Sequence, residues 1–316
     1  MDEAIHMKKY IGADIGGTSI KLGIVDEHGR VECRREINYP KDPDINVLTE
    51  LICGIRAFME ELKISPDDIS GIGVSAAGCI NSVDGCVADN GGNIPNWSRM
   101  EVCRPLREEF GVPASFANDG NCAVMGEFWN GAAKGYTDVV GVILGTGIGG
   151  GIITGGRLLE GSRGFAGEVG HFPIHAGGTH CNCGLDGCYE RYASTSALTN
   201  YASRNNESWS SGRRFFEAVS AGDEDACRIL DSWTDEIAYG IAGLVHVFDP
   251  QLILVGGGVS GQKDLLMEPL RKKVLSMIMP DFADGLEFKA ASLGNNAGLT
   301  GAVYYLLSRE NASDRL

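Results

Sequence analysis

The segment from His171 to Glu190 carries the densest group of metal-binding side chains in this sequence. Three cysteines, Cys181, Cys183 and Cys188, lie within a stretch of eight residues, and His171 precedes them. Three thiolates and one imidazole fill the four tetrahedral positions of a structural zinc ion and leave no position open. The clustering therefore predicts a closed structural zinc site.

Two carboxylates, Glu168 and Glu190, flank the cysteine cluster. A zinc ion that closes the loop would also fix these two side chains, which could then form hydrogen bonds to a ligand rich in hydroxyl groups. His175 and His180 also lie near the cysteines, so either could replace His171 as the fourth ligand.

An aspartate stands where a predicted strand meets a predicted helix. The segment FANDGNCAVMGE, residues 116–127, places Asp119 at this junction beside Asn118. Such a residue is most often the cap of the helix, and either of the two could serve. A carboxylate can also accept the proton of a substrate hydroxyl, and phosphoryl transfer needs little more than this base, a metal ion and correct positioning. Asp119 is therefore either a cap or a general base, and the amide of Asn118 could orient a substrate hydroxyl.

Two glycine-rich turns between predicted strands could bind phosphate groups. Glycine lets backbone N–H groups approach an anion, and it also adopts positive φ. A carboxylate beside such a turn could hold a hydrated Mg²⁺. Either turn alone is also compatible with a plain β-hairpin. The residues concerned are Asp14, Gly16, Gly17, Thr18 and Lys21 in residues 13–26, and Gly145, Thr146 and Gly147 in residues 143–152.

A third glycine-rich segment, LVGGGVSG at residues 254–261, follows a predicted strand and precedes a predicted helix. Its G-x-G-x-x-G pattern is typical of dinucleotide-binding folds, which makes an NAD-dependent dehydrogenase an alternative. No strand that ends in an acidic residue follows it, so we do not prefer this interpretation.

Strand and helix patterns alternate along the chain and indicate two similar αβ halves, each of which opens with a glycine hairpin. We expect a small N-terminal domain, residues 1–117, to which the C-terminal helix within 297–316 returns. We expect a large domain, residues 118–296, that contains the zinc loop. Strands are expected within 8–37, 71–78, 112–119, 137–156 and 251–258, and helices at 45–63, 101–110, 118–133, 213–247, 260–278 and 297–309.

Composition excludes several classes of protein. The net charge of −15 and the lack of a basic run argue against a nucleic-acid partner. No apolar run reaches the ~18 residues of a membrane span, and the N-terminal segment does not resemble a signal peptide. Cysteines outside the cluster are scattered, which favours a reducing cytoplasm over a disulfide framework.

Together these segments resemble the ROK family of sugar kinases and related repressors, which includes bacterial glucokinases. The motifs DIGGTSIKLGIVD, FANDGNCAVMGE, LGTGIGGGI, GEVGH, CNCGLDGCYE and LVGGGVS occur in this order, and the resemblance extends from residue 8 to residue 307. It implies an α/β protein with the actin-like ATPase (ribonuclease H-like) fold, in which two αβ domains enclose a central cleft. It implies a cytoplasmic, homodimeric kinase that uses ATP and Mg²⁺ and carries structural Zn²⁺.

The resemblance also assigns roles to residues of this sequence. Asp119 would be the general base toward the sugar 6-hydroxyl. Zinc would be held by His171 with the three cysteines. The sugar contacts would be Asn118, Glu168, His171 and Glu190, with Asn93 and Asn96 as weaker candidates. The nucleotide would be lined by Gly17, Thr18, Lys21, Thr146, Gly147, Gly257 and Gly258, beside the cofactor-binding candidates Asp14, Gly16 and Gly145 named above.

The resemblance leaves the sugar open. Glucose is the preferred substrate, and N-acetylmannosamine, N-acetylglucosamine, fructose or a β-glucoside are alternatives. The segment GVSAAGCINSVDG has alanine where many family members carry Pro-Gly, on a loop that faces the sugar in the family. A sugar-responsive regulator without catalysis is a more distant alternative, as is a repressor, which would carry a DNA-reading helix-turn-helix ahead of the first glycine turn.

Overall fold

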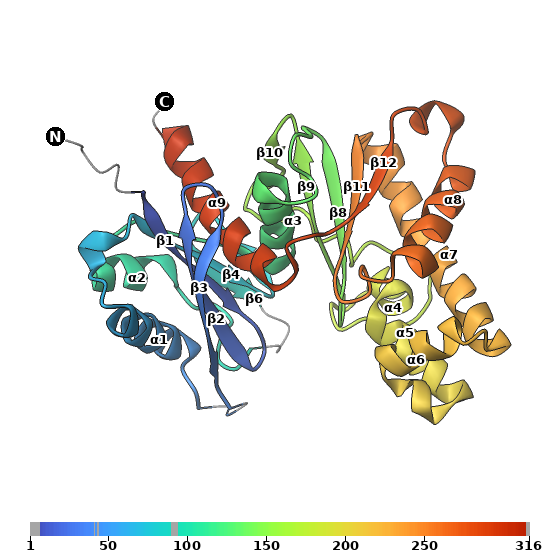
Figure 1. The fold of residues 1–316 in the computed structure, drawn as a ribbon, viewed down its shortest axis with the longest axis horizontal. Coiled ribbons are helices and arrows are strands. Elements are labelled where there is room, and N and C mark those ends of the chain that lie inside the picture. The colour runs from blue at the N-terminus through green and yellow to red at the C-terminus, as the bar shows by residue number, and fades with distance from the viewer. Residues whose placement is uncertain (1–6, 41, 43, 90–93, 314–316) are drawn as a thin grey trace. The chain divides into compact units, whose positions relative to one another are not determined.

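The computed structural model describes residues 7–40, 42, 44–89 and 94–313, which form two compact units (Figure 1). The first unit comprises the described residues up to Lys134, together with Glu160–Ala166 and the segment from Leu293 onward. The second comprises Gly135–Leu159 and Gly167–Ser292.

The first unit is built on a five-stranded sheet with the order β3-β2-β1-β4-β7. β1, β2 and β3 are consecutive antiparallel strands, whereas β1, β4 and β7 run parallel. Parallel strands end at the same edge of a sheet, so Asp14 lies beside Ser75 and Asn118 ends the neighbouring strand. The strands are β1 (Lys9–Ile15), β2 (Ser19–Asp26), β3 (Val31–Asn38), β4 (Gly71–Ala76) and β7 (Ala114–Asn118), and a separate hairpin is formed by β5 (Cys79–Asn81) and β6 (Cys86–Asp89).

Helices cover both faces of this sheet. Alternate residues of β1 point to opposite faces. Ile11 and Ile15 therefore join a core with α1 and α2, whereas Tyr10 packs with Val303 of α9. The helices are α1 (Val47–Leu62), α2 (Cys103–Phe110), α3 (Asp119–Asn130) and α9 (Ala297–Ser313), with short 3₁₀ turns at Pro66–Asp68 and Gly294–Asn296.

The backbone of α9 lies unusually close to β4 and α3. A Cβ atom at Gly73 would lie 2.2 Å from the carbonyl oxygen of Ala302, and one at Gly301 would lie 1.7 Å from that of Cys122. Only glycine permits this approach. Close packing explains why the C-terminal helix belongs to the first unit.

The second unit repeats the same sheet order as β10-β9-β8-β11-β12. β8 and β9 form an antiparallel hairpin, and β8, β11 and β12 run parallel. The duplicated order is that of the actin-like ATPase fold and confirms the predicted fold class. The strands are β8 (Val139–Leu144), β9 (Ile148–Thr154), β10 (Arg157–Leu158), β11 (Leu252–Gly256) and β12 (Glu287–Ala290).

Long helices cover this second sheet. The 25-residue helix α7 begins at Asp223, whose carboxylate accepts a hydrogen bond from the Ala226 N–H, and its apolar face joins the core with β8 and β11. The helices are α4 (Glu190–Ala193), α5 (Thr195–Asn205), α6 (Gly212–Ser220), α7 (Glu224–Phe248) and α8 (Glu268–Met277), with 3₁₀ turns at Glu207–Ser210 and Pro280–Phe282 and a π-helical turn at Lys263–Met267.

The structure differs from the sequence-based expectations in the domain boundary, in one helix and in several additional elements. The first unit extends to Lys134 rather than to residue 117, because α3 packs along α9. The helix expected at 213–247 is two helices, since Gly222 adopts φ +81° between them. Helix α5, strand β12 and the β5–β6 hairpin were not expected.

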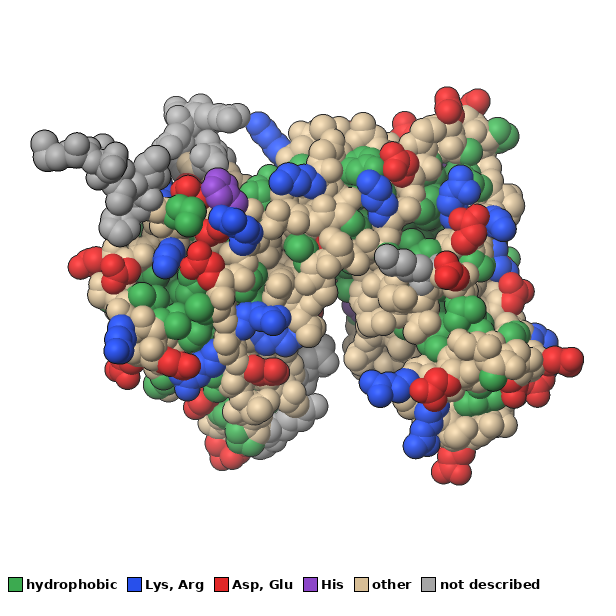
Figure 2. Space-filling model, viewed as in Figure 1, with side chains coloured by type: hydrophobic (Ala, Val, Ile, Leu, Met, Phe, Trp, Pro, Cys, Tyr) green, Lys and Arg blue, Asp and Glu red, His purple; other side chains and the backbone are tan. Residues whose placement is uncertain are grey.

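The surface carries charges of both signs. In Figure 2, lysine and arginine side chains are interspersed with aspartate and glutamate on the visible face of each unit. Within the described residues, no helix is both long and apolar enough to span a membrane.

Candidate active site

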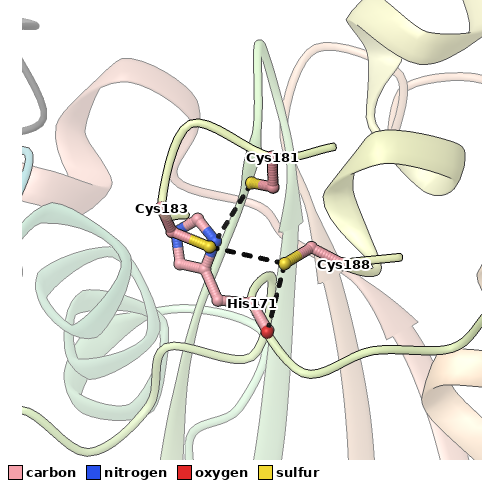
Figure 3. Close-up of side chains that lie close together, drawn as sticks. All are labelled: His171, Cys181, Cys183 and Cys188. Carbon is pink, nitrogen blue, oxygen red and sulfur yellow. Dashed lines mark hydrogen bonds between the residues drawn. The ribbon is translucent and has the colours of Figure 1, made fainter. Parts of the chain in front are cut away.

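The three cysteines and His171 converge on one point in the second unit (Figure 3). Cys181 Sγ lies 3.7 Å from His171 Nδ1, and Cys183 Sγ lies 3.5 Å from Cys188 Sγ. All four donor atoms lie within 4.8 Å of one another. Donors bound to one tetrahedral zinc ion at about 2.0–2.3 Å are separated by roughly 3.5–3.8 Å. The donor set and its spacing therefore fit a closed zinc site.

The two nitrogens of His171 face different partners. Nδ1 faces Cys181, whereas Nε2 lies 4.0 Å from Glu168 Oε2. A neutral imidazole that binds a metal through one nitrogen keeps an N–H on the other. His171 can therefore join the metal site to a ligand beside Glu168.

The two other histidines of the loop are engaged elsewhere. His175 Nε2 lies 2.8 Å from Glu236 Oε2, and His180 Nδ1 lies 2.8 Å from Asp186 Oδ1. Neither belongs to the cluster of donors, so the structure favours His171 as the fourth zinc ligand.

Glu190 links the zinc loop to the second glycine turn. Its Oε1 accepts a hydrogen bond from Cys181 Sγ at 3.2 Å and lies 3.8 Å from His171 Nδ1. A Cβ atom at Gly147 would lie 2.4 Å from Glu190 Oε2. The glycine therefore leaves room for this carboxylate, which is a different role from the nucleotide contact predicted for Gly147.

In the first unit, the cap of α3 is Asn118 and not Asp119. Asn118 Oδ1 accepts from the Asn121 N–H at 3.2 Å, and its Nδ2 donates to the Gly78 carbonyl at 3.1 Å. The structural interpretation of Asp119 as the cap is therefore wrong. The Asn118 side chain also forms a hydrogen bond with the Asp119 carboxylate.

Asp119 has an environment suited to a base. Its Oδ1 accepts a hydrogen bond from the Gly120 N–H at 2.9 Å, and its side chain remains accessible to solvent. The surrounding protein nevertheless desolvates the carboxylate and, with the negative charge of Asp14, raises the pKa of Asp119 to about 6. A carboxylate with this pKa is ionised at neutral pH and accepts a proton more readily than an ordinary aspartate.

Asp14 is held in place by a buried serine. The Ser75 hydroxyl, fully buried on β4, donates to Asp14 Oδ1 at 2.9 Å, and Lys21 Nζ lies 3.8 Å from Oδ2. Burial raises the pKa of Asp14, while Ser75 and Lys21 favour its ionised form. Carboxylate oxygen is the ligand that Mg²⁺ prefers, so Asp14 fits the predicted role near a metal–phosphate group.

The glycine turns achieve their shape in different ways. Gly16 and Gly17 do not have positive φ, so these two glycines do not adopt the left-handed backbone conformation that we expected for the turn. Gly257, after β11, has φ +96°, and a Cβ atom on it would lie 2.0 Å from the Leu144 carbonyl oxygen. Here glycine is required both for the backbone conformation and for close approach.

A cavity of 840 Å³ lies in the second unit beside the β8–β9 turn. This is the size of a pocket that takes a nucleotide-sized ligand. It brings together the predicted residues Gly145, Thr146 and Gly258, whereas Gly147 and Gly257 do not line it. Its other lining residues are Leu144, Thr195, Ser196, Thr199, Gly212, Arg213, Phe216, Glu217, Ser220, Val259 and Gln262.

Most of these other lining residues were not anticipated from the sequence. They come from α5 and α6, where short polar residues alternate with apolar ones without a recognisable ligand motif. Asn93 lies outside the described residues. Asn96 is exposed, has φ 48°, and donates a long hydrogen bond of 3.4 Å to the Ile45 carbonyl.

Comparisons with known proteins agree with this geometry. The model of the ROK family matches residues 10–309. A glucokinase of Thermotoga maritima is 32% identical, with 95% of this chain and 98% of the relative covered. A β-glucoside kinase of Listeria innocua is 30% identical, with 96% and 99% covered. The structure of a ROK family glucokinase from Streptomyces griseus, in complex with glucose and AMPPNP, is 33% identical, covers 93% of this chain and 97% of its own, and gives a TM-score of 0.79.

Proposed function

Because this chain belongs to the ROK family and is an ATP-dependent sugar kinase, we propose that it phosphorylates the 6-hydroxyl of glucose with Asp119 as the general base. The observation that carries the proposal is the position of Asp119 next to the helix cap, together with its raised pKa. Since Asn118 caps the helix, the Asp119 carboxylate is not needed as the cap, and its pKa of about 6 suits a proton acceptor at neutral pH.

Asp119 would accept the proton of the sugar hydroxyl as this oxygen attacks the terminal phosphorus of ATP. The transition state of phosphoryl transfer is loose, so most of the rate enhancement comes from positioning and from neutralising charge on the phosphate. Asn118, whose side chain also hydrogen-bonds the Asp119 carboxylate, would orient the sugar hydroxyl beside the base.

The sugar hydroxyls would be bound by Glu168, His171 and Glu190. Glu168 and Glu190 accept hydrogen bonds, and the Nε2–H of His171 can donate one. Zinc, when bound by His171, Cys181, Cys183 and Cys188, would supply structural rigidity and no open coordination position. It would act by holding the loop that carries these sugar contacts.

The nucleotide would be bound by the glycine turns and the cavity. We propose that Gly16–Thr18 and Gly145–Thr146 contact the phosphates, that Asp14 and Lys21 lie near the Mg²⁺–phosphate group, and that the cavity lined by α5 and α6 holds the nucleoside. When bound, Mg²⁺ neutralises phosphate charge.

The acceptor is tested by measuring ADP release with a panel of sugars. We expect glucose to give the highest kcat/KM. The similarity to a β-glucoside kinase makes a β-glucoside the second candidate, so the panel includes cellobiose beside fructose, N-acetylglucosamine and N-acetylmannosamine. A higher kcat/KM for cellobiose than for glucose would reassign the substrate.

We further propose that the protein is a cytoplasmic homodimer. Outside the zinc loop the cysteines are scattered along the chain, as is usual for a protein of a reducing compartment, and the family resemblance suggests the dimer. Light scattering coupled to size-exclusion chromatography should give twice the chain mass of 33.6 kDa.

The pH dependence of the reaction should follow the ionisation of the Asp119 carboxylate. Because the base must be ionised, and because desolvation by the surrounding protein and the negative charge of Asp14 raise the pKa of Asp119 to about 6, kcat/KM for the sugar should fall about tenfold per pH unit below pH 6. It should be level above pH 7. A profile that stays level down to pH 5 would contradict the assignment.

Thr146→Val should weaken ATP binding selectively. The substitution removes one hydroxyl donor from the β8–β9 turn at nearly constant volume. A lost hydrogen bond to a charged phosphate raises the KM for ATP about tenfold or more, while the KM for sugar changes little. Thr154→Val, at the other end of β9, is the matched control. If only the sugar KM changed, this turn would not contact the nucleotide.

A further inference from the structure

Tyr39 holds the first glycine turn through two separate hydrogen bonds. It directly follows β3, whose pairing with β2 places it opposite Thr18. Its phenol O–H donates to the carbonyl of Gly16, and its backbone N–H donates to the carbonyl of Thr18 at 3.0 Å. One residue therefore binds the carbonyls on both sides of Gly17.

These two hydrogen bonds determine where the N–H groups of the turn point. In a planar trans peptide, the carbonyl of one residue and the N–H of the next point in opposite directions. Because the Gly16 carbonyl points at Tyr39, the Gly17 N–H points away from Tyr39. Gly16 and Thr18 are exposed, whereas Tyr39 is only 4% exposed. The N–H of Gly17 is thus held on the opposite side of the turn from Tyr39, where it can donate a hydrogen bond to an anion.

The side chain of Tyr39 is held in position by the apolar core. Its ring belongs to the apolar core that β1 and β2 share with α1. Burial also raises the pKa of Tyr39 to about 12, so the phenol remains a proton donor at neutral pH. Two adjacent glycines have more backbone freedom than any other pair, so such a turn benefits from an anchor of this kind.

We propose that Tyr39 is a positioning residue for ATP, which fixes the Gly16–Thr18 turn so that the Gly17 N–H is directed toward the phosphates, while the Gly16 N–H donates to the Ser19 carbonyl within the turn. The proposal rests on the proposed function, in which this turn binds phosphate. Tyr39 contacts the turn and not the nucleotide, so its effect on ATP is transmitted through the backbone.

Tyr39→Phe tests the proposal, because it removes only the phenol oxygen and keeps both the ring and the backbone N–H. Tyr10→Phe is the matched control: Tyr10 is 2% exposed on β1 of the same unit and packs on the opposite face of the sheet. ATP and adenosine are titrated into each full-length protein by calorimetry. We expect the Kd for ATP to rise about three- to tenfold in Tyr39→Phe, while its Kd for adenosine and its KM for glucose stay unchanged. In Tyr10→Phe all three constants should equal those of the wild type.

Amide hydrogen exchange at residues 16–18 gives a second measurement that does not depend on activity. Exchange should be faster in Tyr39→Phe than in wild type and in Tyr10→Phe, because the turn has lost an anchor. If Tyr39→Phe weakened the binding of ATP and of adenosine equally, the role of Tyr39 would be merely structural and the proposal would be overturned. The proposal would also be overturned if Tyr39→Phe bound ATP as tightly as Tyr10→Phe does. A wild-type protein that binds adenosine and ATP equally would instead overturn the phosphate-binding role of the turn and, with it, the function on which this proposal rests.

Discussion

Asp119→Asn is expected to lower kcat by about 10²–10⁴-fold, the usual contribution of a general base, while sugar binding is retained. The asparagine has nearly the same shape as aspartate, and its oxygen can still accept the Gly120 N–H, but its amide cannot take up the hydroxyl proton. The fold should be preserved, because Asn118 and not Asp119 caps α3. Single-turnover kinetics measures the chemical step, and calorimetry with glucose measures binding.

Asn118→Ala separates the structural role from the chemical one. Loss of this cap should lower the free energy of unfolding by about 1 kcal/mol and reduce kcat less than Asp119→Asn does. The residual activity of Asp119→Asn should also lack the inflection near pH 6. Turnover close to that of wild type in Asp119→Asn would refute the assignment of the base.

Cys183→Ser is expected to abolish zinc binding and to weaken sugar binding by tenfold or more, with the Kd for nucleotide mostly retained. Cys183 is exposed, so the substitution removes a thiolate ligand without opening a cavity. The proposed sugar contacts Glu168, His171 and Glu190 lie on or beside the loop that zinc would close, so truncating one metal ligand should release them. Elemental analysis should give one zinc ion per wild-type chain.

His171→Ala tests the coupling between metal and sugar. Its Nδ1 faces Cys181 and its Nε2 faces Glu168, so zinc content and sugar affinity should fall together. His180→Ala is the matched control, because His180 lies in the same loop, is largely exposed and pairs with Asp186. Full zinc content in His171→Ala would refute the role of His171 in binding both zinc and sugar.

The Mg²⁺ requirement should be unaffected in all these zinc-site variants, because oxygen and thiolate ligands select different ions.

The features that sequence could predict are those in which nearby residues act together. Three such features are the cysteine loop, the strand–turn–strand hairpins and the aspartate that directly follows β7. Each lies within a short segment, so the spacing of residues along the sequence predicts it. The repeated glycine hairpins predict two similar αβ halves, and the structure adds that both halves have the same sheet order.

What escaped prediction depends on contacts between distant segments. Ser75 meets Asp14 only because β1 and β4 pair in one register, and Tyr39 meets Gly16 only because β3 returns beside β2. Arg213 and Phe216 line the cavity because α6 packs near the β8–β9 turn, which no local pattern reveals. The choice between Asn118 and Asp119 as the cap was also decided by geometry rather than by residue type.

The position of α9 has a consequence for how the protein is made. Synthesis proceeds from the N-terminus, and domains usually fold in that order as they leave the ribosome. Here the second unit is complete at Ser292, whereas the first still lacks the helix that covers Gly73 and packs on α3. The half of the protein that is synthesised first is therefore the last to be finished, and one face of its sheet stays incompletely covered until the final helix is released.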